Sequence, residues 1–354
     1  MKPGLLNSPD KPAGGPPQTE PRSERGLIAS IRARVPAPPP WLTIGIGDDA
    51  AAAEPARGAL EILTADSLVE SIHFDRALSR PDDIGWKALA VNLSDVAAMG
   101  GTPRLALLSL GIPDALDAGE IHALIDGFLA LAAATHVTLA GGNITRSPGP
   151  LIVDVTVAGF ARRRHVLTRA GGHPGDDLYV TGEVGSAAAG LGWWKAMKDT
   201  KGTWDTNEIA EMDACVARHR RPEPRVRLGA LLGRNRAASA CMDLSDGLAD
   251  AVRQVAEASN TGALVEAASV PITAAARAWF SRSGQDPLMA AMAGGDDYEL
   301  LFSVPRRARG RLATVIRQAR GVPITRIGTL TPGRDVAVRR DGRDEPLPAG
   351  FAHF

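Results

Sequence analysis

The chain has few cysteines, few aromatic residues and no excess of charge of either sign, and each shortage removes a class of function. Only Cys215 and Cys241 are present, so neither a disulfide framework nor a structural zinc site is expected. Aromatic residues make up 4% of the chain, which leaves little for base stacking, and 40 basic residues balance 40 acidic ones. We therefore expect no nucleic-acid partner and a reduced, cytoplasmic location.

Long apolar runs are missing as well. No stretch of about 18 consecutive apolar residues occurs, and the Pro- and Gly-rich start lacks the apolar core of a signal peptide. Residues 1–24 carry too little apolar surface to offset the entropy of ordering, so we expect a disordered tail. The sequence therefore predicts a soluble protein with no membrane partner.

The rest of the chain alternates strand-like and helical stretches, which predicts a mixed α/β (α+β) fold with enough residues for two medium cores. We place the first domain at residues 25–165. Within it we expect helices at 25–35, 84–99 and 120–134, strands at 59–65, 104–110, 137–140 and 151–160, and a polar turn over Gly141–Pro150.

The second domain, residues 166–354, repeats this alternation. Charge density rises over Lys195–Met212, which suggests a surface excursion. We expect strands at 177–181, 240–244, 299–304 and 324–330, and helices at 186–196, 248–258 and 306–320.

Aspartates recur beside Gly, Ser or Thr in segments that we expect to be strand ends or turns. A single Asp of this kind is usually a turn former or a helix cap, and Asp176-Asp177 fits that interpretation. Repetition favours a shared site for most of the others. The clusters are Gly45–Asp49, Thr64–Asp66, Leu93–Asp95, Asp176-Asp177, Asp243–Gly247 and Gly294–Asp297.

Converging carboxylates repel one another, which raises the pKa of some of them unless cations neutralise the site. The available ligands are hard oxygens with no His or Cys cluster, and they favour several Mg²⁺ or Mn²⁺ ions over zinc. Mg²⁺ commonly accompanies nucleotide phosphates. Backbone N–H groups of Gly141-Gly142-Asn143 would approach those phosphates, with Arg146 and Arg169 adding positive charge.

Common nucleotide-binding scaffolds do not fit the sequence. Gly45–Ala50 formally matches G-x-G-x-x-A, but it carries two carboxylates and lacks a βαβ context. Neither a phosphate-binding G-x-x-x-x-G-K-[ST] loop nor a protein-kinase H-R-D set occurs. His73 faces either the same site or the core, and Ser245 is better interpreted as a nucleotide contact than as part of a catalytic triad.

Four motifs stand in order in the first domain, and three follow in the second: Gly45–Ala50, Asp66–Glu70 with His73-Phe74, Lys87–Asp95, Ala97–Gly100, Leu167–Arg169, Met242–Gly247 and Gly295–Leu300. Together they reach nearly to the C-terminus. With them the chain resembles the thiamine-monophosphate kinase family of the aminoimidazole ribonucleotide synthetase-like superfamily.

The resemblance implies two α/β domains, with ATP between them and the N-terminal domain pairing across a homodimer. It implies ATP-dependent, Mg²⁺-dependent phosphorylation of thiamine monophosphate to thiamine diphosphate. Metal positions fall on Asp48, Thr64, Asp66, Asp95, Asn143, Asp243 and Asp246; ATP contacts fall on Gly142, Asn143, Arg169 and Ser245; substrate contacts fall on His73, Asp296 and Phe351.

Four positions depart from the family pattern. Asn143 replaces an Asp and Ala65 replaces a hydroxyl residue, and each change is expected to weaken one metal position. Asp296 replaces a Glu on the substrate side. Pro348 replaces an aromatic residue near the C-terminus, a role that Phe351 could take.

The substrate phosphate is already anionic near neutral pH, so direct in-line attack on the γ-phosphorus requires no general base and we assign none. Positioning and charge neutralisation then supply the catalysis. Two alternatives stay open: another ATP-using enzyme of the same superfamily, and a nucleotide-binding homologue without catalytic activity.

Overall fold

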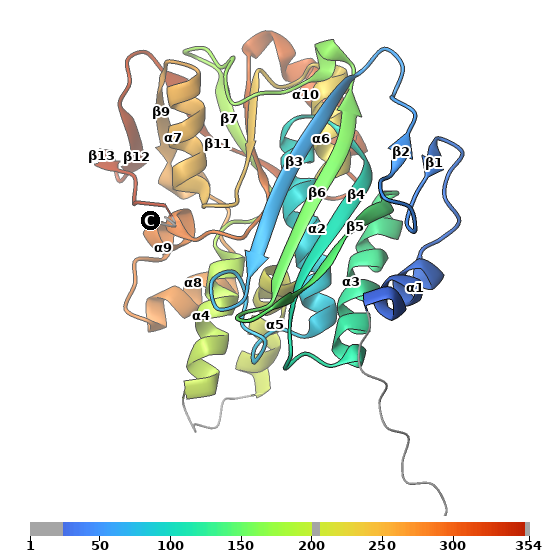
Figure 1. Cartoon of the computed structure of the whole chain (residues 1–354). Coiled ribbons are helices and arrows are strands. Elements are labelled where there is room, and N and C mark those ends of the chain that lie inside the picture. Colours follow the sequence, from blue (N-terminus) through green and yellow to red (C-terminus); the bar gives the residue numbers. More distant parts are fainter. Residues whose placement is uncertain (1–23, 200–205, 351–354) are drawn as a thin grey trace, which may run out of the picture.

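A four-stranded sheet backed by two helices organises the first half of the chain, as seen in a computed structural model that describes residues 24–199 and 206–350 (Figure 1). Its strand order is β3-β6-β4-β5, and a separate hairpin-like pair, β1-β2, precedes it. The elements are α1 (Glu24–Arg34), β1 (Leu42–Ile44), β2 (Ala52–Ala53), β3 (Leu60–Val69), α2 (Pro81–Ala98), β4 (Thr102–Pro113), α3 (Ala118–Thr135), β5 (Thr138–Ser147) and β6 (Ile152–Ala161).

A seven-stranded sheet in the order β13-β12-β9-β11-β7-β10-β8 organises the second half. Its strands are β7 (Asp177–Thr181), β8 (Ala240–Asp243), β9 (Gly262–Glu266), β10 (Leu300–Val304), β11 (Ile324–Thr331), β12 (Val336–Arg340) and β13 (Arg343–Pro346). Its helices are α4 (Ser186–Asp199), α5 (Thr206–Arg220), α6 (Val226–Asn235), α7 (Leu248–Ala258), α8 (Ala274–Arg282), α9 (Pro287–Ala293) and α10 (Arg309–Gln318), with short 3₁₀ turns η1 (Arg163–His165), η2 (Ala267–Ser269) and η3 (Arg306–Ala308).

Helix α2 is apolar on nearly every side because it packs against α3, against the four-stranded sheet and against α6 and β8 of the second half. Glycines let α2 and α3 approach closely. A Cβ on Gly85 would lie 1.8 Å from the Leu124 carbonyl oxygen, and one on Gly127 would lie 1.9 Å from that of Asp82. The helix therefore carries its few polar side chains into the protein interior.

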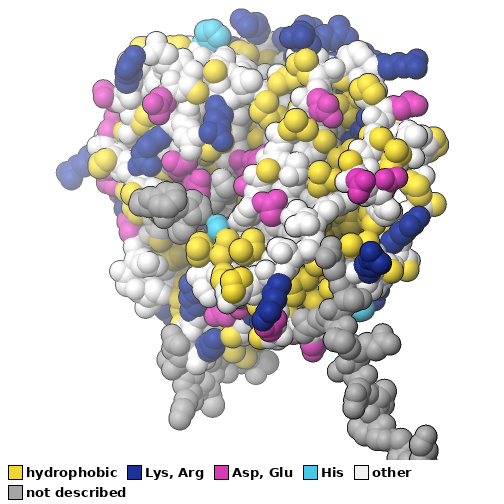
Figure 2. All heavy atoms as spheres, viewed as in Figure 1, with side chains coloured by type: hydrophobic (Ala, Val, Ile, Leu, Met, Phe, Trp, Pro, Cys, Tyr) yellow, Lys and Arg dark blue, Asp and Glu magenta, His cyan; other side chains and the backbone are white. Residues whose placement is uncertain are grey.

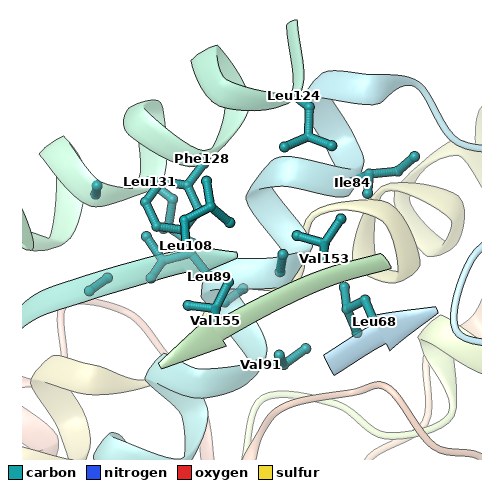
Figure 3. Close-up of a cluster of buried hydrophobic side chains, with 14 of the residues drawn as sticks. Leu68, Ile84, Leu89, Val91, Leu108, Leu124, Phe128, Leu131, Val153 and Val155 are labelled. Atoms are coloured by element: carbon teal, nitrogen blue, oxygen red, sulfur yellow. The ribbon is translucent and has the colours of Figure 1, made fainter. Parts of the chain in front are cut away.

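The core of the first half lies between the sheet and its two helices. Figure 3 shows Leu89 of α2 and Phe128 of α3 meeting Leu108 and Val155 from the strands, and all four side chains are buried. By length and composition α3 is apolar enough to cross a membrane, yet its buried side chains belong to this same core. Packing against the sheet and α2 accounts for its apolar character.

No helix among residues 24–199 and 206–350 covers the opposite face of the four-stranded sheet (Figure 1). Along β3, exposed side chains on this face alternate with buried ones. Leu63 of β3 is 69% exposed there. Its cross-strand neighbours Ala158 and Leu105 extend an apolar row over β6 and β4. Figure 2 shows hydrophobic side chains gathered over these strands.

Most expected elements are present, and the expected α7 has the bounds observed. The polar turn predicted over Gly141–Pro150 is wrong, because β5 continues through Ser147 and pairs in parallel with β4 as far as Pro113. Ladder hydrogen bonds to β4 here outweigh the weak strand propensity of glycine. Where the structure describes the surface excursion predicted over Lys195–Met212, it consists of the end of α4 and the start of α5, which pack against each other, with Lys195, Lys198 and Glu211 exposed.

Two of the aspartate clusters do not lie at strand ends or turns. Asp66 lies inside β3, and Asp95 lies in the last turns of α2. The elements that were not predicted from the sequence are β2, α5, α6, α8, α9, β9, β12 and β13. The division between residues 165 and 166 stays a prediction, and the predicted tail lies outside the described residues except for Glu24, where α1 begins.

Candidate functional site

A cavity of about 770 Å³ lies where the two halves meet, and residues from both halves line it. Strand β3 and the turn after it form one wall, α2 forms the floor, and the loops after β8 and α9 form the other wall. Seven residues predicted from the sequence come together here: Asp66, His73, Asp95, Asp243, Ser245, Asp246 and Asp296.

Asp66, Asp95 and Asp243 form a tight acidic cluster. Thr64 Oγ1 donates a hydrogen bond to Asp95 Oδ2 at 2.5 Å, and Ser94 Oγ donates one to Asp243 Oδ2 at 2.8 Å. Thr64 thereby contributes through Asp95, although it does not line the cavity itself. The two hydroxyl groups fix the carboxylates of α2 and β8 side by side between the halves.

Burial and mutual repulsion raise the pKa values in this cluster. Burial, and next the neighbouring Asp95, raise the pKa of Asp66 from 3.8 to about 6. Burial, and next Asp95, raise that of Asp243 to about 7, against the opposing influence of Ser94 and Arg169. Burial also raises the pKa of Asp95. The protein itself therefore leaves much of this negative charge uncompensated.

These residues fit a hard divalent cation by their chemistry, because carboxylate and hydroxyl oxygens are the ligands that Mg²⁺ prefers. The excess negative charge favours such an ion as well. Among residues 24–199 and 206–350, no group of three or more His, Cys, Asp or Glu side chains is placed to hold one ion.

A second polar network surrounds Asp296 on the opposite wall. Lys87 Nζ lies 2.8 Å from Asp296 Oδ2, His219 Nδ1 lies 3.3 Å from the same oxygen, and Tyr298 donates to Oδ1 at 3.0 Å. Burial opposes the ionisation of Asp296, but Lys87 and next His219 outweigh it and hold its pKa well below the ordinary range. Burial, and next Lys87, lower the pKa of His219. Asp296 is thus a fixed anion beside a neutral imidazole.

The loop that carries Asp296 is strained. Asp296 and Tyr298 have φ angles of 68° and 48°, a left-handed conformation that side chains larger than glycine rarely adopt. Backbone hydrogen bonds from Asp296 to Ser245 and from Tyr298 to Leu244 hold them there. Between them, the Asp297 carboxylate accepts hydrogen bonds from the N–H groups of Gly185 and Ala187 at the start of α4.

His73 lies in the turn after β3 and lines the cavity. Its Nδ1 accepts a hydrogen bond from the Val69 N–H at 3.0 Å. The neutral ring therefore carries its proton on Nε2, and that atom is the donor for other partners. Of the two interpretations that the sequence left open for His73, the structure favours the site.

Several predicted site residues do not line the cavity. Asp48 lies exposed in the loop between β1 and β2, and Gly142 and Asn143 lie exposed on the edge strand β5. Arg169 donates to Gln254, yet its charge still reaches Asp95 and Asp243. Phe351 lies outside the described residues. The roles assigned to these five residues stay predictions.

A polar row on the open face of the four-stranded sheet leads from the cavity toward Asn143. Ser67, which lines the cavity, donates a hydrogen bond to Asp154 on β6. Asp154 pairs in register with Ser109 on β4, and Ser109 pairs with Asn143 on β5. With strands about 4.8 Å apart, the row spans about 14 Å.

The sequence analysis missed Lys87, His219, Tyr298 and Ser67 as site residues. Lys87 carried a usable signal, because it is a lone cation in the apolar helix α2, where an unpaired charge would be costly. His219 lies in α5 and lines the cavity together with Asp296, and no local pattern in the sequence joins the two. Only the tertiary structure brings α5 beside the loop that carries Asp296.

Family models described as AIR synthase related protein, N-terminal domain and C-terminal domain, match residues 47–161 and 173–341. A thiamine-monophosphate kinase of Bacillus subtilis is 38% identical over 288 residues, covering 80% of this chain and 84% of the relative. A solved thiamine-monophosphate kinase of Stenotrophomonas maltophilia superposes with a TM-score of 0.78 at 39% identity, covering 91% and 98% of the two chains. A structure described as AaThiL complexed with AMPPCP and TMP gives 0.72 at 30% identity, covering 94% and 97%.

Proposed function

The chain belongs to the thiamine-monophosphate kinase family among the AIR synthase related proteins, and we propose that it catalyses that family's reaction in the cavity between its halves. It is a kinase that transfers the γ-phosphoryl group of ATP to thiamine monophosphate, giving thiamine diphosphate and ADP. The observation that carries the proposal is the cluster of Asp66, Asp95 and Asp243 in a cavity lined from both halves.

Asp66, Asp95, Asp243 and Asp246 would hold Mg²⁺, with Thr64 orienting Asp95 and with Asp48 and Asn143 as further predicted ligands. When bound, Mg²⁺ supplies positive charge that offsets the charge of the phosphates and of these carboxylates. Ala65 is exposed on the other face of β3 from Thr64 and Asp66, so its methyl group removes no ligand from the acidic cluster.

The nucleotide would extend from the cavity along the polar row on the open sheet face, with Ser245 at the cavity end and Asn143 and Gly142 at the far end. The row of about 14 Å is similar in length to an extended nucleotide. The N–H groups on the outer edge of β5 face away from β4, which suits contact with an anion. Arg169 lies close enough to the acidic cluster for its charge to oppose the rise that burial causes in the pKa of Asp95, and it would contact the nucleotide there.

Thiamine monophosphate would occupy the wall formed by His73 and Asp296. The Nε2 proton of His73 suits a phosphate oxygen, and the fixed negative charge of Asp296 suits the cationic thiazolium ring. Phe351 remains the predicted aromatic contact. These residues orient two bound reactants in line, and the substrate phosphate is the nucleophile, so no proton need be abstracted.

The test is direct. Purified protein with ATP, Mg²⁺ and thiamine monophosphate is expected to form thiamine diphosphate and ADP in equal amounts, measured by chromatography. Unphosphorylated thiamine serves as the control acceptor and is expected to give no product. Binding of ATP without any product would favour the homologue without catalytic activity, and product from another acceptor alone would favour a different enzyme of the superfamily.

The open face of the four-stranded sheet would pair with a second copy to form the homodimer. Leu63, 69% exposed, and its neighbours Ala158 and Leu105 supply an apolar row there. We expect Leu63→Arg to halve the mass measured by light scattering, because two buried arginines would face the apolar row. Ile316→Arg, at a 46% exposed apolar residue on α10, is the matched control. An unchanged mass for Leu63→Arg would contradict this interface.

The cytoplasmic location expected from the sequence stays a prediction.

A further inference from the structure

A second large cavity, of about 800 Å³, lies just past the C-terminal end of α2, beyond the last turns that carry Asp95 of the acidic site. No residue lines both cavities. Gly100, just past the C-terminal end of α2, lines this one, whereas Asp95 and Val91 within the helix line the first. The cavity is therefore a separate feature of the fold, and the proposed function makes no use of it.

Five arginines line this cavity and no acidic residue does: Arg57, Arg162, Arg164, Arg227 and Arg234. All five are exposed. Elsewhere the arginines of this chain commonly have carboxylate partners, as when Arg309 and Arg326 bind Asp177 and Arg340 binds Asp286. Within residues 24–199 and 206–350, no ion pair joins the five to a carboxylate, and Arg227 reaches only the Gln318 carbonyl oxygen, at 3.3 Å. Their positive charge is uncompensated.

Three of the five arginines, together with Arg236, act on the imidazole of His165. Burial, and next Arg164, Arg162, Arg234 and Arg236, lower the pKa of His165, which also lines the cavity. Figure 2 shows Lys and Arg side chains gathered along the top of the molecule, above the end of β6 in Figure 1. Four guanidinium groups around one ring form a field that favours anions.

The backbone that carries these arginines is held firmly. A Cβ on Gly100 would lie 2.8 Å from the His165 carbonyl oxygen, and one on Gly233 would lie 2.2 Å from the same atom. The Leu167 N–H also bonds to the Met99 carbonyl oxygen at 3.0 Å. Turn η1 is thus fixed against the ends of α2 and α6, so the backbone that carries its arginines needs little ordering when a ligand binds.

We propose that this cavity binds a multiply charged phosphate compound, namely the diphosphate or triphosphate group of a nucleotide or of an inorganic polyphosphate. Guanidinium groups bind phosphate oxygens in a bidentate way, and five of them match a chain of phosphates better than a single one. The volume suits a nucleotide, and half-buried Phe160 in the wall offers an aromatic surface for a base.

The helix ends near the cavity and the composition of the chain both bear on which anion it binds. The C-terminal ends of α2 and α6 point partial negative charge at this region, but five full positive charges exceed it. The chain has no net charge and only 4% aromatic residues, which disfavours a nucleic-acid surface. A compact polyanion is therefore favoured over a polymer.

Titration calorimetry with inorganic tripolyphosphate, in EDTA to remove metal, tests the proposal. Without metal the acidic site repels the anion, so we expect one binding site per chain, weakened at least about tenfold in Arg162→Ser/Arg164→Ser. Arg306→Ser/Arg307→Ser removes the same charge from exposed arginines of η3 that do not line the cavity, and it is the matched control. Kinase activity is expected to be unchanged in both variants, which shows that they fold.

Titrations with other anions distinguish the possible ligands. In the same EDTA buffer, ADP binding that is tighter than that of tripolyphosphate and is weakened in Arg162→Ser/Arg164→Ser supports a nucleotide, and tighter binding of tripolyphosphate supports the inorganic anion. Absence of tripolyphosphate binding, or equal weakening in the two double variants, would overturn the proposal. Tighter binding of a single-stranded oligonucleotide than of tripolyphosphate or ADP would overturn it too, in favour of a nucleic-acid partner. Arg57→Ser, in the turn before β3, provides an independent variant if the η1 pair does not fold.

Discussion

Asp66→Asn is expected to lower kinase turnover by at least about a thousandfold while the fold is kept. Asparagine has the shape of aspartate but not its charge. The loss of turnover would therefore come from the missing negative charge of Asp66 near the reacting phosphates. Asp95→Ala is expected to do the same, because Asp95 lies beside Asp66 and raises its pKa. Turnover of the purified variants with ATP, Mg²⁺ and thiamine monophosphate provides the measurement.

Asp126→Asn, at a surface carboxylate on α3 with an exposed fraction of 60%, is the matched control and should keep full activity. Near-normal Mg²⁺-dependent turnover of both Asp66→Asn and Asp95→Ala would contradict the proposal that this cluster takes part in the reaction. The proposed anion site beyond α2 would be untouched by that outcome, because it involves none of these residues.

The Asp66→Asn variant should melt at a higher temperature than the natural protein in EDTA at neutral pH. Since folding raises the pKa of Asp66 from 3.8 to about 6, ionisation of this group destabilises the folded state. The destabilisation is absent below about pH 4 and is complete above about pH 6. Thermal melts of metal-free protein from pH 4 to pH 8 should therefore fall less steeply for Asp66→Asn. A loss of stability in that variant would instead indicate a structural role.

Lys87→Met is expected to destabilise the protein by about 2–3 kcal/mol, measured by urea unfolding. Lys87 is buried, and its loss would leave the Asp296 carboxylate without its main counter-charge in a loop that is already strained. The figure is below that of a fully buried pair, because the Asp296 side chain is 32% exposed.

A double variant separates charge from packing. Lys87→Met/Asp296→Asn removes both charges and should recover most of the lost stability. Lys198→Met is the matched control, because Lys198 pairs with Asp75 on the surface at 3.7 Å and its loss should cost less than about 0.5 kcal/mol. Equal destabilisation by the single and double variants would show that Lys87 matters through its packing alone.

The acidic half of the site could be predicted from the sequence because its residues lie in short local motifs. Asp243, Ser245 and Asp246 lie within four residues, and the same motif begins α7 at its observed bounds. The Asp296 network could not be predicted in this way. Lys87, His219 and Tyr298 come from three separate elements, and no spacing along the chain indicates that they meet.

The sequence by itself determined the family, the two α/β halves and most of the carboxylates that meet in the cavity, because motif order and apolar periodicity are local properties of the chain. Only the tertiary structure decided that β5 is a strand through Gly141–Ser147, since partners on β4 supply the hydrogen bonds that propensity alone would not. It also placed Asp66 in mid-strand facing α2, and it gathered five distant arginines around the end of that helix. Burial, pairing and the summed field of charges depend on distances in space, and residue order does not fix those distances.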